Sequence, residues 1–193
     1  MPLPLPTSLS PSKVASFKDC ALAFRFSAID RLPEPPSPWA TRGTLVHRAL
    51  ELLFCEEPKR RTLDVALGHL ATARAEMSDD PEFVGLALDE EADAAFVAEA
   101  AGHVRRYFEI EDPRAVHPIG LELRLEVQVG SLTLRGIIDR LDLDADGELV
   151  VTDYKTGKVP GVNFEQNRLG GVHIYAFLCE QDLGRRPARV QLL

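Results

Sequence analysis

The stretch that decides the fold is "GIIDRLDLDADGELVVTDYKTGK", which runs from Gly136 to Lys158. Two segments rich in β-branched and apolar residues flank the turn-forming sequence "DADG", a pattern typical of antiparallel strands joined by a short loop. Each segment carries an aspartate, Asp139 in the first and Asp153 in the second, and Lys155 follows shortly afterwards. These charges need a chemical reason, because a buried and unpaired charge is costly.

A third strand precedes these two. The segment "LELRLEVQV" (121–129) alternates strictly between apolar and polar residues, and a tight turn begins at Gly130. A two-residue turn at this point places Glu122 opposite Asp139, and the "DADG" loop places Asp139 opposite Asp153. Cross-strand neighbours lie roughly 5 Å apart. The sequence therefore predicts a row of three carboxylates across three adjacent strands.

Such a row suggests a metal site. Carboxylates this close repel one another and raise each other's pKa, and oxygen ligands of this kind suit Mg²⁺ or Mn²⁺. Lys155, on the same strand face as Asp153, could then hold an attacking water or a phosphate oxygen. The alternative is a solvated sheet face with cross-strand ion pairs, such as one between Glu126 and Arg135.

His47 and Glu51 lie four residues apart in "GTLVHRALE" and therefore share one face of a predicted helix. The functional interpretation is that His47 is a further metal ligand and that Glu51 orients it. Spacing alone favours the alternative, an exposed histidine–glutamate pair.

The order of predicted elements indicates a single α/β (α+β) domain over residues 1–193, with a central mixed sheet flanked by helices. The predicted parts are an N-terminal helix and a proline-rich loop (1–43), a core helix with Thr44 as its N-cap (44–54), an all-helical insert with helices near 62–76 and 89–108 (55–113), and a sheet with a C-terminal core that includes a helix near 164–183 (118–193).

Composition narrows the function classes. Apolar residues make up 45% and charged residues 27% of the chain, and the formal charge is −8, which argues against a general nucleic-acid coat. The sequence has no apolar run of membrane-spanning length and its proline-rich start does not resemble a signal peptide, so we expect a cytoplasmic protein with no membrane partner.

Taken in order, "GTLVHRALE", "GIIDRLD" and "DYKTG" resemble the motifs of the RecB-like exonuclease branch of the PD-(D/E)XK nuclease superfamily, and the opening "LSPSKVASFKDCALAFRF" resembles the start of that branch. The resemblance implies the restriction-endonuclease-like core of this superfamily. It also implies roles for particular residues: His47, Asp139, Asp153 and the carbonyl of Tyr154 as metal ligands, Lys155 as the catalytic lysine, and Glu122 and Tyr175 as further catalytic residues.

Two features depart from that family. The helix after the lysine motif commonly carries a glutamine four residues before its tyrosine; here this position is Gly171, and His173 is either a partial substitute or a surface histidine. Many relatives bind a 4Fe–4S cluster, but only Cys20 stands at a cluster position, so we expect no cluster in this chain. Cys55 and Cys179 are interpreted as small buried residues, and relatives contain a C-terminal segment that we expect this chain to lack.

The resemblance implies a Mg²⁺- or Mn²⁺-dependent DNA nuclease, of the exonuclease type, acting on DNA ends or single strands in repair or recombination. The alternative is a catalytically weak, nuclease-like module that binds DNA or a helicase subunit. A third interpretation, an acidic helical interaction protein, leaves the carboxylate row unexplained. The basic residues predicted to line a DNA groove are Lys13, Lys18, Arg25, Arg42, Arg48, Lys155 and Lys158.

Overall fold

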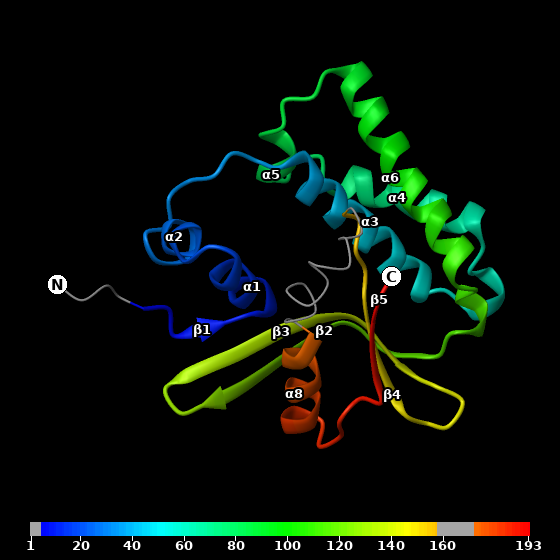
Figure 1. The fold of residues 1–193 in the computed structure, drawn as a ribbon. Helices are drawn as coiled ribbons and strands as arrows, with labels where there is room; N and C mark the ends of the chain where they lie inside the picture. Colours follow the sequence, from blue (N-terminus) through cyan, green and yellow to red (C-terminus); the bar gives the residue numbers. More distant parts are fainter. Residues whose placement is uncertain (1–4, 158–171) are drawn as a thin grey trace.

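The computed structural model describes residues 5–157 and 172–193. In Figure 1, helices α3, α4 and α6 lie together on one side of a sheet whose long strands are β2 and β3. The chain begins with a short strand and three short helical segments that stand apart from this helical layer: β1 (Ser8–Leu9), α1 (Pro11–Asp19), α2 (Ala21–Phe24) and the π-helical turn η1 (Arg25–Ile29). This mixed α/β architecture confirms the predicted fold class.

Helix α3 (Pro38–Phe54) begins earlier than predicted. The side chain of Ser37 accepts a hydrogen bond from the backbone N–H of Ala40, and Pro38 occupies the first helical turn, where its missing N–H costs nothing. Thr44 is therefore an interior residue of the helix, and the prediction that it is the N-cap was wrong. The proline-rich loop ends at a proline that starts a helix.

The predicted helical insert consists of α4 (Leu63–Glu76), α5 (Pro81–Val84) and α6 (Glu90–Ile110), with 3₁₀ turns at Pro58–Arg60 and Pro113–Ala115. Thr62 and Asp89 are the N-caps of α4 and α6, and these positions agree with the helix starts predicted near residues 62 and 89. These helices share one apolar core with α3, so the insert packs directly against that helix.

The sheet has the predicted register. Strand β2 (Pro118–Val129) pairs antiparallel with β3 (Leu132–Leu143) along nearly its whole length, and Gly130, with φ of 59°, supplies the left-handed conformation that the tight turn needs. The other edge of β3 is shared: β1 pairs with its beginning, and the antiparallel strand β4 (Leu149–Asp153) pairs with its end. Strand β5 (Arg189–Leu192) then adds in parallel to β4.

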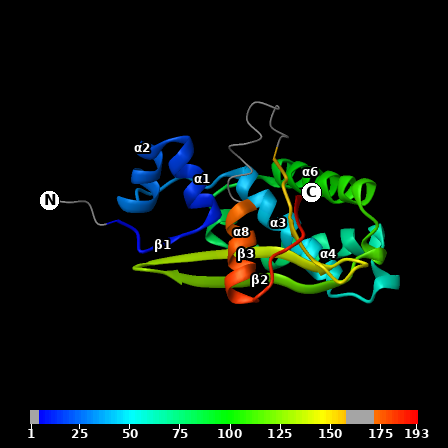
Figure 2. The same ribbon diagram turned by 60° about the horizontal axis from the view of Figure 1, so that its bottom comes forward.

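Helix α8 (Val172–Asp182) lies across β2 and β3, as Figure 2 shows. Its Leu178 and Cys179 are buried in a second apolar cluster formed with the sheet. Gly136 permits this close approach, since a Cβ atom there would lie 2.9 Å from Leu178 Cδ1. The part of the predicted 164–183 helix before residue 172, including Gly171, lies outside the described residues. None of the described helices has the apolar length that crossing a bilayer requires.

Candidate metal centre

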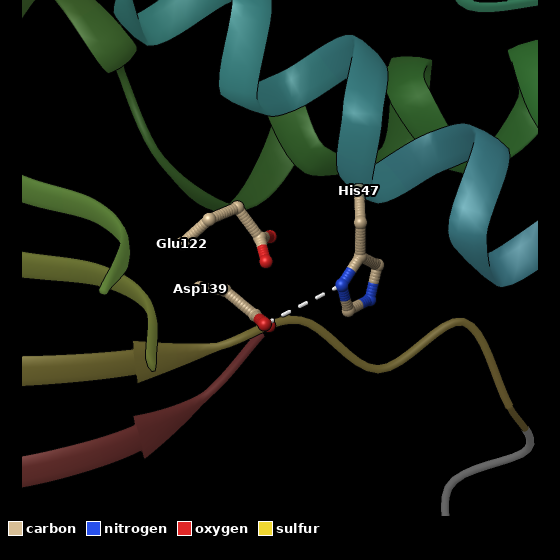
Figure 3. A group of neighbouring side chains, drawn as sticks. All are labelled: His47, Glu122 and Asp139. Carbon is tan, nitrogen blue, oxygen red and sulfur yellow. Dashed lines mark ion pairs between the residues drawn. The ribbon is translucent and has the colours of Figure 1, made fainter. Parts of the chain in front are cut away.

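Three predicted site residues come together between the helical layer and the sheet. His47 projects from α3, Glu122 from β2 and Asp139 from β3, and Figure 3 shows both carboxylates turned toward the imidazole. One ligand atom from each residue lies within 4.8 Å of the other two. Asp139 is buried, whereas His47 and Glu122 are half-buried, so the group remains open on one side. An imidazole nitrogen and two carboxylates form a donor set that fits Mn²⁺ and, less ideally, Mg²⁺.

The orientation of His47 is fixed from two directions. Its Nδ1 lies 3.5 Å from Asp139 Oδ1, and its Nε2 lies 3.1 Å from the backbone carbonyl oxygen of Tyr154. A carbonyl can only accept, so Nε2 carries a proton and Nδ1 faces the carboxylates. The backbone N–H of Tyr154 in turn donates to Asp139 Oδ2 at 2.6 Å. Tyr154, a predicted ligand through its carbonyl, thus holds both His47 and Asp139 in place, an arrangement typical of residues behind a metal site.

The negative charges of the carboxylates around His47 favour a positive charge at this position. Burial acts to lower the pKa of His47, but the hydrogen bond and charge of Asp139, together with the charges of Asp153 and Glu122, outweigh it and raise that pKa. Burial, followed by the charge of Asp139, raises the pKa of Glu122. The carboxylates therefore attract either a proton or a cation to the same small volume.

The backbone of Glu122 is strained. Its φ of 44° lies in the left-handed region, which a side chain such as glutamate rarely adopts. Its neighbours Leu121 and Leu123 pair with Arg140 and Ile138, so the strand register on both sides is the predicted one. Backbone strain of this kind costs on the order of 1–3 kcal/mol and gathers at functional sites.

Asp153 and Lys155 form a second part of the site at the end of β4. The ammonium of Lys155 pairs with Asp153 Oδ2, and the hydroxyl of Tyr175 on α8 lies 3.5 Å from Asp153 Oδ1. Burial raises the pKa of Asp153, an effect that the charge of Lys155 opposes. Backbone bonds between β4 and the residues after β5 hold this end of the strand, with the Lys155 N–H donating to the Leu193 carbonyl at 2.7 Å. Asp153 is thus engaged with a lysine and a tyrosine outside the three-residue group.

Other predicted contacts are replaced by different ones. Glu51 was expected to orient His47, but its carboxylate pairs with Arg48 at 2.8 Å. Several groove cations are likewise bound within the chain: Arg25 pairs with Asp30, Arg42 with Glu99, and Arg48 also with Glu76. Lys13 Nζ donates to the Ser8 carbonyl, Lys18 is exposed, and Lys158 lies outside the described residues.

The structure shows which of the cysteines are buried and that His173 is exposed. Cys179 is fully buried, as predicted, but Cys55 is exposed at the C-terminal end of α3, which corrects its interpretation as a buried residue. Cys20 is also exposed, and its Sγ caps α2 by accepting from the Ala23 N–H at 3.5 Å. His173 is a surface residue.

Arg140, which the sequence patterns did not single out, organises the interior behind the site. Arg140, next to Asp139, is fully buried, and its Nε donates to both oxygens of Asp142 at 2.9 and 3.0 Å. Its remaining donors reach Glu111, Tyr107, Tyr154 and Thr152, and the guanidinium lies over the ring of Phe54. A clue was present in "DRLD", where an arginine and an aspartate two residues apart share one face of a strand.

This network acts on the metal centre through Tyr154. Arg140 donates to the Tyr154 hydroxyl at 2.9 Å, while the backbone of the same tyrosine contacts His47 and Asp139. Fixing the ring of Tyr154 therefore also fixes the main chain that contacts both side chains.

The chain is similar to known proteins over most of its length. The profile of the PD-(D/E)XK nuclease superfamily matches residues 8–193. The Gene 69 protein of Mycobacterium phage D29 is 26% identical over 175 residues, an alignment that covers 81% of this chain and 65% of the phage protein. The chain thus spans less than two thirds of the length of that relative. Because the family profile covers residues 8–193, the chain belongs to the PD-(D/E)XK nuclease superfamily.

Proposed function

We propose that this chain is a divalent-metal-dependent deoxyribonuclease that hydrolyses phosphodiester bonds. The observation that carries the proposal is the convergence of His47, Glu122 and Asp139, with donor atoms within 4.8 Å of one another. Superfamily membership supports it, since metal-dependent nucleases make up this superfamily. When bound, Mg²⁺ or Mn²⁺ supplies Lewis-acid chemistry at the phosphate and favours the ionisation of water.

The protein's own residues orient the reactants. His47, Glu122 and Asp139 would hold the cation, and the backbone of Tyr154 orients the imidazole and the Asp139 carboxylate. Lys155 is more than half exposed, so its ammonium can turn from Asp153 toward a phosphate oxygen or the attacking water. Tyr175 then remains the neighbour of Asp153 and limits the movement of that carboxylate.

The finer assignments are also proposals. The motif order supports a RecB-like, exonuclease-type enzyme that acts on DNA ends or single strands in repair, in the cytoplasm and with a helicase as a possible partner. A second candidate, a catalytically weak DNA-binding module, is favoured by one observation: Asp153 and Lys155 neutralise each other, and Asp153 stands outside the three-residue group.

Calorimetric titration of Mn²⁺ into the chain, combined with a labelled-DNA cleavage assay, separates the two candidates. We expect binding and cleavage in the native chain and loss of both in Asp139→Ala. Asp146→Ala, which removes an exposed aspartate from the β3–β4 loop, is the matched control and should retain both. Binding without cleavage would favour the weak module, and cleavage that persists in Asp139→Ala would refute the proposed site.

A further inference from the structure

Trp39 is the single tryptophan of the chain and is 68% exposed, an unusual position for the largest apolar side chain. It lies in the first turn of α3, the helix that carries His47. Residues four apart on a helix are neighbours on one face, so Trp39, Gly43 and His47 follow one side of α3. With a rise of about 1.5 Å per residue, Trp39 lies about 12 Å along the helix from His47.

Gly43, which lies between Trp39 and His47, faces the segment that follows β4. A Cβ atom on Gly43 would lie 3.1 Å from Thr156 Oγ1, so the α3 backbone runs directly beside the segment that follows Lys155. The side of α3 between Trp39 and His47 therefore faces the segment just after β4, and Trp39 lies on the same side of the helix as the candidate metal centre.

The indole is held on one face and open on the other. The guanidinium of Arg42 lies over the ring, 4.6 Å from its centroid. Arg42 is itself almost completely buried and paired with Glu99 on α6, and within the described part of the chain its Nε has no hydrogen-bond partner. A fixed cation behind an exposed indole orders the ring before any ligand arrives, which lowers the entropic cost of stacking on its free face.

Arg42 also connects the indole to charged residues of α6. Desolvation and the charges of Arg42 and Arg106 lower the pKa of His103, whereas the charge of Glu99 raises it. Arg42 is thus the cation that lies directly beside the Trp39 ring. An aromatic ring beside cations is the combination by which proteins hold the bases and backbone of single-stranded nucleic acid.

From this geometry we propose that Trp39, backed by Arg42, is a stacking platform for an unpaired base of single-stranded DNA on its way to the metal centre. The inference rests on the proposed function, because it takes DNA as the substrate. A base inside a duplex is already stacked on both sides, so the platform selects unpaired strands.

The single tryptophan gives a direct measurement. Without divalent metal, a short oligothymidine should quench the intrinsic fluorescence of the full chain, whereas a blunt-ended hairpin duplex should leave it nearly unchanged. In an anisotropy titration with labelled oligothymidine, Trp39→Ala should weaken binding roughly 5- to 150-fold, the range expected for one stacked base. Trp39→Tyr should restore most of the affinity. Ile110→Ala, which removes another exposed apolar side chain at the end of α6, should bind as the native chain does.

Unchanged fluorescence with oligothymidine, unchanged affinity in Trp39→Ala, or equal quenching by the duplex would each overturn the platform. These failures differ from failure of the proposed function. A chain that cleaves DNA with Mn²⁺ but shows no quenching refutes the platform alone, whereas a chain that shows quenching but no cleavage refutes the nuclease and leaves the platform standing.

Discussion

Replacing Arg140 with methionine should remove several kcal/mol of stability. Arg140 donates to both oxygens of Glu111 at 2.7 and 2.9 Å and to both oxygens of Asp142. Asp142 is only 6% exposed, so the variant leaves its carboxylate buried without a counter-charge. Breaking a buried ion pair from one side costs about 3–5 kcal/mol, a large part of a typical domain's 5–15 kcal/mol.

Urea unfolding measures this loss. With a slope of about 2 kcal/mol per molar urea, the midpoint of Arg140→Met should fall by about 1.5–2.5 M. Arg135→Met is the matched control on the same strand, because Arg135 is exposed, and its free energy of unfolding should change by less than about 0.5 kcal/mol.

The pH dependence of the stability loss tests whether the unpaired Asp142 carboxylate causes it. Burial already raises the pKa of Asp142, and Arg140 opposes that effect. Without the guanidinium, the folded-state pKa of this carboxyl rises further above its unfolded value, so the folded variant binds more protons and loses stability as pH increases. The deficit of Arg140→Met should therefore be smaller at pH 5 than at pH 8. A loss below about 1 kcal/mol, or a deficit independent of pH, would refute a desolvated ion-pair network.

Two further outcomes follow from the packing and the metal centre. Gly136→Ala places a methyl group 2.9 Å from Leu178 Cδ1, so overpacking should cost about 1–3 kcal/mol in a urea titration, and an unchanged midpoint would contradict the close approach of α8. The raised pKa values of His47, Glu122 and Asp153 all give the metal-free chain stability that is present at low pH and is lost as pH rises through the folded pKa values. Because Mn²⁺ competes with these protons, thermal denaturation should show a larger Mn²⁺-induced rise in Tm at pH 8 than at pH 6; an equal rise would indicate binding elsewhere.

The sheet could be predicted because its constraints are local. Alternation in β2, the tight turn at Gly130 and the "DADG" loop determine the register, and the observed pairs of Leu121 with Arg140 and of Arg140 with Thr152 agree with it. The same local rules placed Glu122 beside Asp139, although no pattern indicated the left-handed backbone at Glu122.

The predicted contact between Glu51 and His47 was wrong because tertiary contacts, which no local sequence pattern contains, determine the partners of both side chains. Glu51 shares a helix face with His47, yet Arg48 binds it, and the imidazole is held by a carbonyl more than 100 residues away. The start of α3 was missed for a different reason: prolines were read as loop formers, whereas Pro38 after Ser37 is a helix start.

The helical insert is part of the scaffold of the site. Tyr107 lies on α6 and Glu111 at its C-terminal end, and both contact Arg140. Arg140 also donates to the hydroxyl of Tyr154, whose backbone contacts the candidate ligands His47 and Asp139. If residues 62–111 were replaced by a short flexible linker, Arg140 would keep a buried charge without Glu111, and α3 would lose the apolar surface that covers it. We therefore expect the shortened chain to show no cooperative urea transition and no Mn²⁺ binding. A shortened chain that unfolds cooperatively and binds Mn²⁺ would instead show that the sheet and α3 form the site by themselves.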